Sequence, residues 1–275
     1  IYSLTGHSFF AMAIVKALIS AFIFIVIFFI GRYIFGNIVG LSAAFLTAFH
    51  PGIIVYTAKF HAFVLDSLLL CLIVWFLIKL KEAPTFLNEF KLGISFGLAM
   101  LTRSTVILFL PFSWLWLKKK SKKLFLVYIL ISLILLTPWL IRNYLIYRKV
   151  VIVSTSANVF WSGNNPQATG TSLTASGKPM LQKDKDFYSL IYGKSEMEQN
   201  RIFWNESFKF ISNNPKKFIK LFFKKFFYFW WFAPTTGSEY KKEWLTIYKI
   251  FYSAILLFSL LGISEIKKLP SLPRN

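Results

Sequence analysis

Residues 11–30 read AMAIVKALISAFIFIVIFFI, and residues 124–141 read LFLVYILISLILLTPWLI. The first stretch contains one charged residue, Lys16, and the second contains none. Apolar runs of about 18 residues or more are long enough to cross the hydrocarbon core of a membrane. One such run at the start of a chain is also compatible with a signal peptide, but similar runs recur along the whole sequence. The sequence therefore predicts an all-α integral membrane protein with several spans.

Composition agrees with this prediction. Of the 275 residues, 56% are hydrophobic and only 16% are charged, whereas soluble domains average about 45–50% apolar and about 25% charged residues. The 32 basic residues outnumber the 11 acidic ones and give a net charge of +21. In membrane proteins Lys and Arg collect in cytoplasmic loops and bind anionic headgroups, so we expect membrane lipids and no nucleic acid as partners. The one cysteine, Cys71, excludes a disulfide within the chain.

The apolar stretches predict seven spans. Six lie in a membrane-spanning region over residues 1–146, at about 9–31, 38–50, 63–80, 91–102, 104–117 and 124–141, and the last lies at 244–264. Residues 147–214 are polar and are predicted to form an external segment after the sixth span. Residues 215–232 are basic and aromatic, and residues 265–275 are predicted to be a cytoplasmic tail.

Basic residues orient these spans, because Lys and Arg concentrate in cytoplasmic loops. The five lysines between residues 118 and 123 are the strongest cytoplasmic marker. Placing Arg32 and Lys79 on the same side turns the apolar blocks before residue 118 into two hairpins. The outer tips of these hairpins lie at residues 50–61 and near Arg103, and the segment 147–214 is then external.

The second hairpin has an alternative, which is one long tilted helix over residues 92–117. That helix would place Arg103 in the bilayer centre, where a charged side chain costs at least about 2.5–3.5 kcal/mol. The hairpin avoids this cost, but each of its legs is shorter than a membrane core of about 30 Å requires. We favour the hairpin, with legs packed among other helices.

Residues 215–232 have the pattern of an amphipathic helix. Four of the five lysines in this range fall within an arc of about 100° on a helical projection, while phenylalanines cover the other side. These residues are Lys216, Lys217, Lys220, Lys224 and Lys225, with Phe218, Phe222, Phe226 and Phe229. We expect a helix that lies in the membrane interface, extended by Trp230 and Trp231. It acts either as a simple anchor or also as a site for an anionic lipid phosphate.

The predicted topology gathers unusual polar residues at the outer ends of spans. They are His50, Lys59, His61, Asp66, Arg103, Arg142 and Asn143. Polar groups at membrane depth are costly and are usually functional. The alternatives are an ion pair of Asp66 with Lys59 or His61 that serves structure only, and histidines that are ordinary interfacial residues. No spacing of His, Cys, Asp and Glu matches a zinc or calcium site, so we expect no metal and no cofactor.

Several motifs occur in a characteristic order along nearly the whole chain. They are GRYIFG at 31–36, His50-Pro51 with Tyr56, GISFGLAMLTR at 93–103, PWLIRNY at 138–144, SGNNP at 162–166 with ATG at 168–170, and Asn214-Pro215 before the Lys- and Phe-rich helix. This ordered set resembles the bacterial protein O-mannosyltransferase-like superfamily, glycosyltransferase family 39, with its aminoarabinose-transferase relatives. The resemblance implies a GT-C-type helical bundle in the bacterial inner or plasma membrane, with the external segment on the periplasmic or extracellular side.

The resemblance also implies an activity. Such enzymes transfer a hexosyl or pentosyl group from a polyprenyl-phosphate donor to a protein, lipid or glycan acceptor at the outer face. The leaving group is a lipid phosphate, so cations must stabilise its developing charge, and the candidates are Lys59, His61, Arg103 and Arg142. A carboxylate must act as base toward the acceptor hydroxyl. Asp66 resembles the family's second acidic position and is our catalytic candidate.

Three asparagines are candidates for the acceptor side. Asn143, together with Asn164 and Asn165 in the external segment, is predicted to belong to a loop that shapes an acceptor pocket. The alternative is a loop in which Asn, Gly and Pro serve turns for backbone reasons alone. The sequence leaves both interpretations open.

The chain also departs from the family pattern. Ile1 to Ser8 resembles the region between the first external loop and the second span, so we expect the first span and its acidic loop, which carries the usual base, to be missing. The family also continues with spans beyond Gly262. We therefore expect either a fragment of an enzyme whose base lies in that loop, or a non-catalytic relative that binds polyprenyl phosphate as a scaffold. A transporter requires polar residues through both leaflets and internal repeats, and the sequence shows neither.

Overall fold

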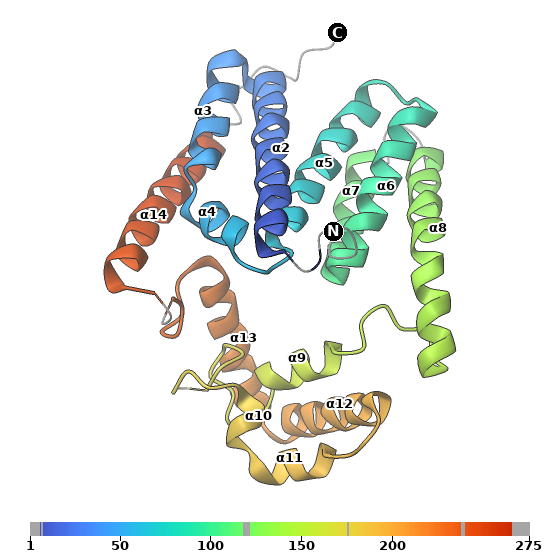
Figure 1. Ribbon diagram of the computed structural model, residues 1–275, viewed down its shortest axis with the longest axis vertical. Coiled ribbons are helices and arrows are strands. Elements are labelled where there is room, and N and C mark those ends of the chain that lie inside the picture. The colour runs from blue at the N-terminus through green and yellow to red at the C-terminus, as the bar shows by residue number, and fades with distance from the viewer. Residues whose placement is uncertain (1–5, 7, 118–121, 175, 238–239, 266–275) are drawn as a thin grey trace. The chain divides into compact units, whose positions relative to one another are not determined.

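The computed structural model describes residues 6, 8–117, 122–174, 176–237 and 240–265. Within these ranges the chain forms helices and no strand, apart from an isolated bridge between Leu173 and Pro179, which confirms the all-α prediction. The chain divides into two compact units (Figure 1). Unit 1 comprises residues 1–142 and 246–275, and unit 2 comprises residues 143–245.

Four helices are long and apolar enough to cross a membrane, and a bent pair of helices gives a fifth candidate. The four are α2 (Phe9–Phe35), α5 (Phe63–Glu82), α8 (Lys122–Tyr147) and α14 (Lys242–Glu265), and the pair is α3 (Asn37–Ala48) with α4 (Pro51–Ala58), bent by 48°. The protein is therefore a multi-pass membrane protein, as predicted. Helices α2 and α8 extend beyond the expected spans 9–31 and 124–141, and α4 continues past residue 50, where the second span was expected to end.

The predicted spans 91–102 and 104–117 correspond to shorter elements. Helix α6 covers Phe86–Thr102, and it is followed by the 3₁₀ helix η1 (Ser104–Phe109) and by α7 (Leu110–Leu117). That these legs cross the membrane stays a prediction, and so does the direction of every span. Residues 118–121 of the basic run and 266–275 of the expected tail lie outside the described residues.

The chain reverses direction at Arg103. Its backbone is extended, with φ −149° and ψ 99°, and α6 ends one residue before it. The following residues Ser104, Thr105 and Val106 have low helix propensity, which favours this break. Farther on, Trp116 lies near the C-terminal end of α5, because its Nε1 donates a 3.4 Å hydrogen bond to the Leu77 carbonyl. The alternative of one continuous helix over 92–117 is therefore wrong.

Two glycines of α6 let it pack closely against α8. A Cβ atom on Gly93 would lie 2.7 Å from Cβ of Ile131, and one on Gly97 would lie 2.8 Å from Cδ2 of Leu135. Small residues spaced by four allow such backbone approach between membrane helices. Buried Ser132 on α8 adds a 2.9 Å hydrogen bond to the Gly93 carbonyl. This contact fixes the position of α6 and of Arg103 at its end.

Unit 2 has a small hydrophobic core of its own. Its helices are α9 (Ser156–Gly163), α10 (Met180–Lys183), α11 (Lys185–Ile191), α12 (Glu196–Asn213) and α13 (Pro215–Trp230). In the core Trp161 stacks on Phe187 with ring centroids 4.2 Å apart, and both rings contact Phe203. Residues 147–214 thus contain packed helices. Their external location stays a prediction.

Candidate functional site

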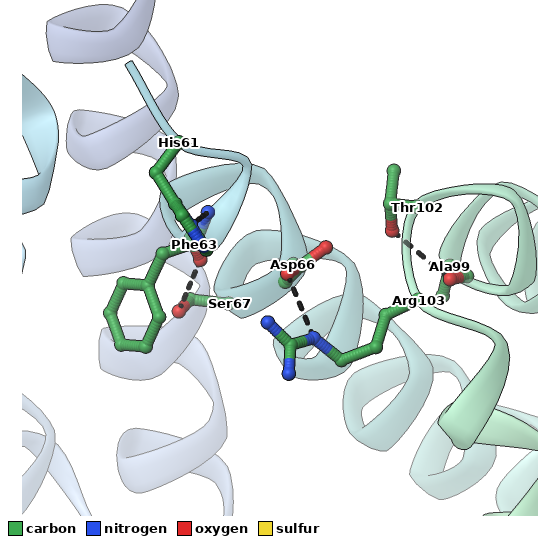
Figure 2. A network of polar contacts seen from close by, with 7 residues as sticks. All are labelled: His61, Phe63, Asp66, Ser67, Ala99, Thr102 and Arg103. Atoms are coloured by element: carbon green, nitrogen blue, oxygen red, sulfur yellow. Dashed lines mark hydrogen bonds and ion pairs between the residues drawn. The ribbon is translucent and has the colours of Figure 1, made fainter. Parts of the chain in front are cut away.

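An ion pair between a buried aspartate and a half-exposed arginine joins α5 to the end of α6. The Nε atom of Arg103 donates to Oδ2 of Asp66 at 3.0 Å, and Figure 2 shows the other carboxylate oxygen pointing away from the arginine. Asp66 lies in the first turn of α5 and is only 6% exposed. The alternative that Asp66 pairs with Lys59 or His61 is therefore wrong, because Arg103 is its partner; the catalytic role of Asp66 stays a prediction.

The ion pair leaves one carboxylate oxygen of Asp66 and the two terminal nitrogens of Arg103 outside their mutual hydrogen bond. Oδ1 of Asp66 is buried and has no hydrogen-bond partner among the described residues, although buried polar atoms are normally paired. The Arg103 side chain is 49% exposed, and only its Nε is engaged by the carboxylate. A guanidinium fixed in this way presents its two terminal nitrogens to a ligand, an arrangement suited to phosphate oxygens.

Lys59 and His61 lie at the same end of unit 1. Lys59 follows the last turn of α4, and His61 comes just before α5 (Figure 2). Nδ1 of His61 accepts a 3.0 Å hydrogen bond from the backbone N–H of Phe63. The Nε2 side of this exposed ring is therefore the side that can meet a ligand. The structure thus brings two of the predicted cations to the end that holds Asp66 and Arg103.

Lys16 is a further polar residue near this end, and the sequence showed it only as a break in an apolar run. Its side chain is 7% exposed, and its Nζ donates to the carbonyls of Tyr56, at 2.6 Å, and Lys59. Both carbonyls lie at the end of α4, where helix carbonyls lack partners within the helix. Lys16 on α2 therefore holds the segment that leads to His61. A lone lysine within 20 apolar residues was the signal available in the sequence.

A pocket of about 380 Å³ adjoins this segment. Its walls are mostly apolar side chains of α2, including Met12 and Ile19, with Phe60 and Leu65 opposite. His61 and Lys16 supply its polar lining atoms. An apolar pocket edged by the Lys16 ammonium and by a histidine that can donate from Nε2 suits a ligand that joins a hydrocarbon chain to an anionic group.

Comparison with known proteins identifies the family. The sequence profile of the dolichyl-phosphate-mannose-protein mannosyltransferases matches residues 1–141. The chain belongs to this family. Members are membrane glycosyltransferases that use polyprenyl-phosphate sugar donors, so the family-level resemblance is confirmed, and the bacterial subgroup stays a prediction. No curated protein and no solved structure matched the chain.

The match to this mannosyltransferase family covers the Asp66–Arg103 pair together with Lys59 and His61. Arg142 lies just beyond the matched region, and its guanidinium stands over the ring of Trp139, 4.8 Å from the centroid. The neighbouring Asn143 is buried, and its Nδ2 donates to the Val151 carbonyl at 2.8 Å. Both contacts are local, and the donor or acceptor roles of these two residues stay predictions.

Unit 2, which lies outside the family match, contains the other two asparagines. Asn165 is 2% exposed; its amide donates to the Trp161 carbonyl at 2.8 Å, and its Oδ1 accepts from the Gln167 N–H at 2.7 Å. Asn164 is also buried, and its Oδ1 accepts a 2.8 Å hydrogen bond from Nζ of Lys225. Both amides shape the turn, and their role toward an acceptor stays a prediction. Burial lowers the pKa of the Lys225 amine.

The described residues contain no group of three or more His, Cys, Asp or Glu side chains arranged to hold a metal ion.

Proposed function

We propose that this chain transfers a hexosyl or pentosyl group from a polyprenyl-phosphate donor to an acceptor at the outer face of a bacterial membrane. The observation that carries the proposal is the Asp66–Arg103 pair. It lies inside the family match, in a bundle of membrane-spanning helices, and it combines a buried carboxylate with a half-exposed guanidinium. At the same end, Lys59 adds a cation for a lipid phosphate and His61 adds a hydrogen-bond donor at Nε2.

The transfer exchanges one bond to the anomeric carbon for another. An acceptor hydroxyl attacks this carbon, and the bond from the carbon to the donor's phosphate oxygen breaks. The electron pair leaves with the lipid phosphate, whose developing charge needs fixed cations. Arg103 is the principal cation because Asp66 already orients it. Lys59 and Arg142 are the additional cations, and His61 donates a hydrogen bond from Nε2 to the phosphate.

The proton of the acceptor hydroxyl goes to a carboxylate. Asp66 contributes this carboxylate in our proposal, because Oδ2 is engaged by Arg103 while Oδ1 has no partner in the described chain. A single displacement of this kind inverts the anomeric configuration. Asn143, Asn164 and Asn165 act indirectly, by shaping the segments that follow α8 on the acceptor side.

The test compares the ion pairs at the two ends of α5. Arg103→Ala and Asp66→Asn are assayed in nanodiscs with a panel of polyprenyl-phosphate hexoses and pentoses and with membrane extract as the acceptor source. We expect transfer to fall by about 10²–10³-fold, the effect of removing one transition-state contact. The matched controls are Lys79→Gln and Glu82→Gln, which break the 2.9 Å pair at the other end of α5 and should keep transfer. Full transfer in both site variants would refute the site assignment.

A binding measurement separates the enzyme from a scaffold. A photoreactive polyprenyl phosphate should label the wild-type chain and should label Arg103→Ala less. Labelling that depends on Arg103, together with no transfer from any donor of the panel, would assign the non-catalytic scaffold function in place of transfer.

A further inference from the structure

Helix α13 presents three different surfaces around its axis, at about 100° per residue. One surface packs inward and contains Leu221, which is 4% exposed. A second surface is apolar and exposed over most of the helix length. Its members are Ile219, Phe222, Phe223, Phe226, Phe229 and Trp230, each at least half exposed. The third surface contains lysines, including Lys216 and Lys220, and lies beside the apolar one.

The inward surface ties α13 to the loop that contains Asn164 and Asn165. Leu221 packs against Phe210 and Ala168. Nζ of Lys217 donates to the Pro166 carbonyl at 2.6 Å, and Nζ of Lys225 donates to Asn164. These two lysines hold the loop, so they are engaged within the protein.

The outward lysines differ from these. Lys216 and Lys220 are exposed, and neither has a hydrogen-bond or ion-pair partner in the part of the chain that the structure describes. The helix itself contains no acidic residue. One helical turn on from Lys220 stands Phe223, which is 65% exposed. An exposed apolar strip bordered by unpaired cations is complementary to a surface that combines hydrocarbon with negative charge.

We propose that α13 lies flat on an anionic leaflet. The apolar surface enters the acyl boundary, Lys216 and Lys220 bind the phosphates of anionic lipids, and Lys217 with Lys225 holds the 162–170 loop on the same helix. Trp230 and Trp231 at the end of α13 suit the headgroup level. Helix α14, a candidate span, begins at Lys242 soon after α13 ends, so chain continuity keeps α13 near a membrane. This favours lipid over a soluble protein partner.

Lipid charge then acts on the loop through one rigid element. Lys216 and Lys220 bind the lipid headgroups, and Lys217 and Lys225 fix the turn that contains Asn164 and Asn165. The inference depends on α13 and its contacts, and it stands whether or not the chain transfers sugar.

The experiment measures the depth of one side chain in the full-length protein. Cys71→Ser removes the native thiol, and Phe223→Cys carries a nitroxide label. Accessibility to oxygen and to an aqueous nickel complex reports the ratio of docked to undocked α13. The nanodiscs contain phosphatidylcholine alone or phosphatidylcholine with phosphatidylglycerol. We expect phosphatidylglycerol to raise the docked fraction, and we expect Lys216→Gln with Lys220→Gln to lower the ratio about fivefold for each lysine removed.

The control removes equal charge from unit 2 away from α13. Lys178→Gln with Lys194→Gln changes two exposed lysines and should leave the phosphatidylglycerol effect intact. Three results would overturn the proposal: a label that nickel reaches in both membranes, a label shielded from both reagents because protein covers it, and a phosphatidylglycerol effect that survives loss of both outward lysines. Circular dichroism of each variant verifies that the fold is kept.

Discussion

The replacement Gly93→Ala tests how tightly α6 is held against α8. The added Cβ would lie 2.7 Å from both Cβ and Cγ2 of Ile131 and 2.9 Å from the Tyr128 carbonyl oxygen. Because one of these neighbours is backbone, the two helices must separate, and overpacking of this kind costs about 2–3 kcal/mol. Alanine in a helix regains about 1 kcal/mol relative to glycine. The net loss of stability is therefore about 1–2 kcal/mol.

The measurement is thermal unfolding of the protein in nanodiscs, where a loss of 1 kcal/mol lowers Tm by about 2–4 °C in a chain of this size. The matched control is Gly262→Ala in α14, where a Cβ would meet nothing within 4 Å and Tm should stay or rise. Because Arg103 directly follows α6, sugar transfer should fall together with Tm in Gly93→Ala. A Gly93→Ala protein as stable as the control would refute the close packing of α6 against α8.

Two further predictions concern single polar contacts. Lys16→Met takes the ammonium donor from the Tyr56 carbonyl, at about 1–3 kcal/mol, while the Lys59 carbonyl keeps the N–H of His61 at 2.9 Å. Hydrogen exchange of residues 56–62 should therefore rise at least about 5-fold; unchanged exchange would contradict the capping role. Hydrogen bonds from Ser154 and Tyr147 hold the pKa of Glu196 below its usual range. Their contribution is complete above about pH 4.5 and is lost as pH falls through the lowered value. The protection of residues 147–156 against hydrogen exchange, corrected for the intrinsic rate at each pH, should therefore fall in acid for the wild type and stay constant with pH in Glu196→Gln.

The long spans could be predicted from the sequence because their signal is local. The length and hydrophobicity of one apolar run are enough to predict a membrane-spanning helix. Residues 11–30 and 124–141 were predicted in this way, and they lie in α2 and α8. Helix ends were less predictable, because they depend on single residues; α2 continues to Phe35 and stops at Gly36, whose φ is +93°. The hairpin at Arg103 could be anticipated from the cost of a central arginine.

The contacts of the candidate site could not be predicted in the same way. Asp66 and Arg103 are 37 residues apart and belong to different helices, so their pairing depends on how α5 meets α6. The sequence suggested Lys59 or His61 as the ion-pair partner of Asp66, because they are close to it in the chain. The acceptors of Lys16 are backbone carbonyls, which leave no trace in a sequence. The repeated glycines at 93 and 97 indicate close packing, but they do not identify the partner helix.

The capping of α4 by Lys16 also constrains how the protein is made. Synthesis proceeds from the N-terminus, so α2 leaves the ribosome before its acceptors, which lie 40 and 43 residues later in the chain. Until then, α2 offers the translocon an ammonium group without a partner, and a lysine within a span opposes insertion, by up to about 2.5–3.5 kcal/mol at the centre of a helix. Either the apolar residues of α2 outweigh this penalty and α2 inserts alone, or α2 stays in the translocon until α4 has been synthesised and can pair with Lys16. The order of synthesis thus makes α2, α3 and α4 a cooperative unit of insertion.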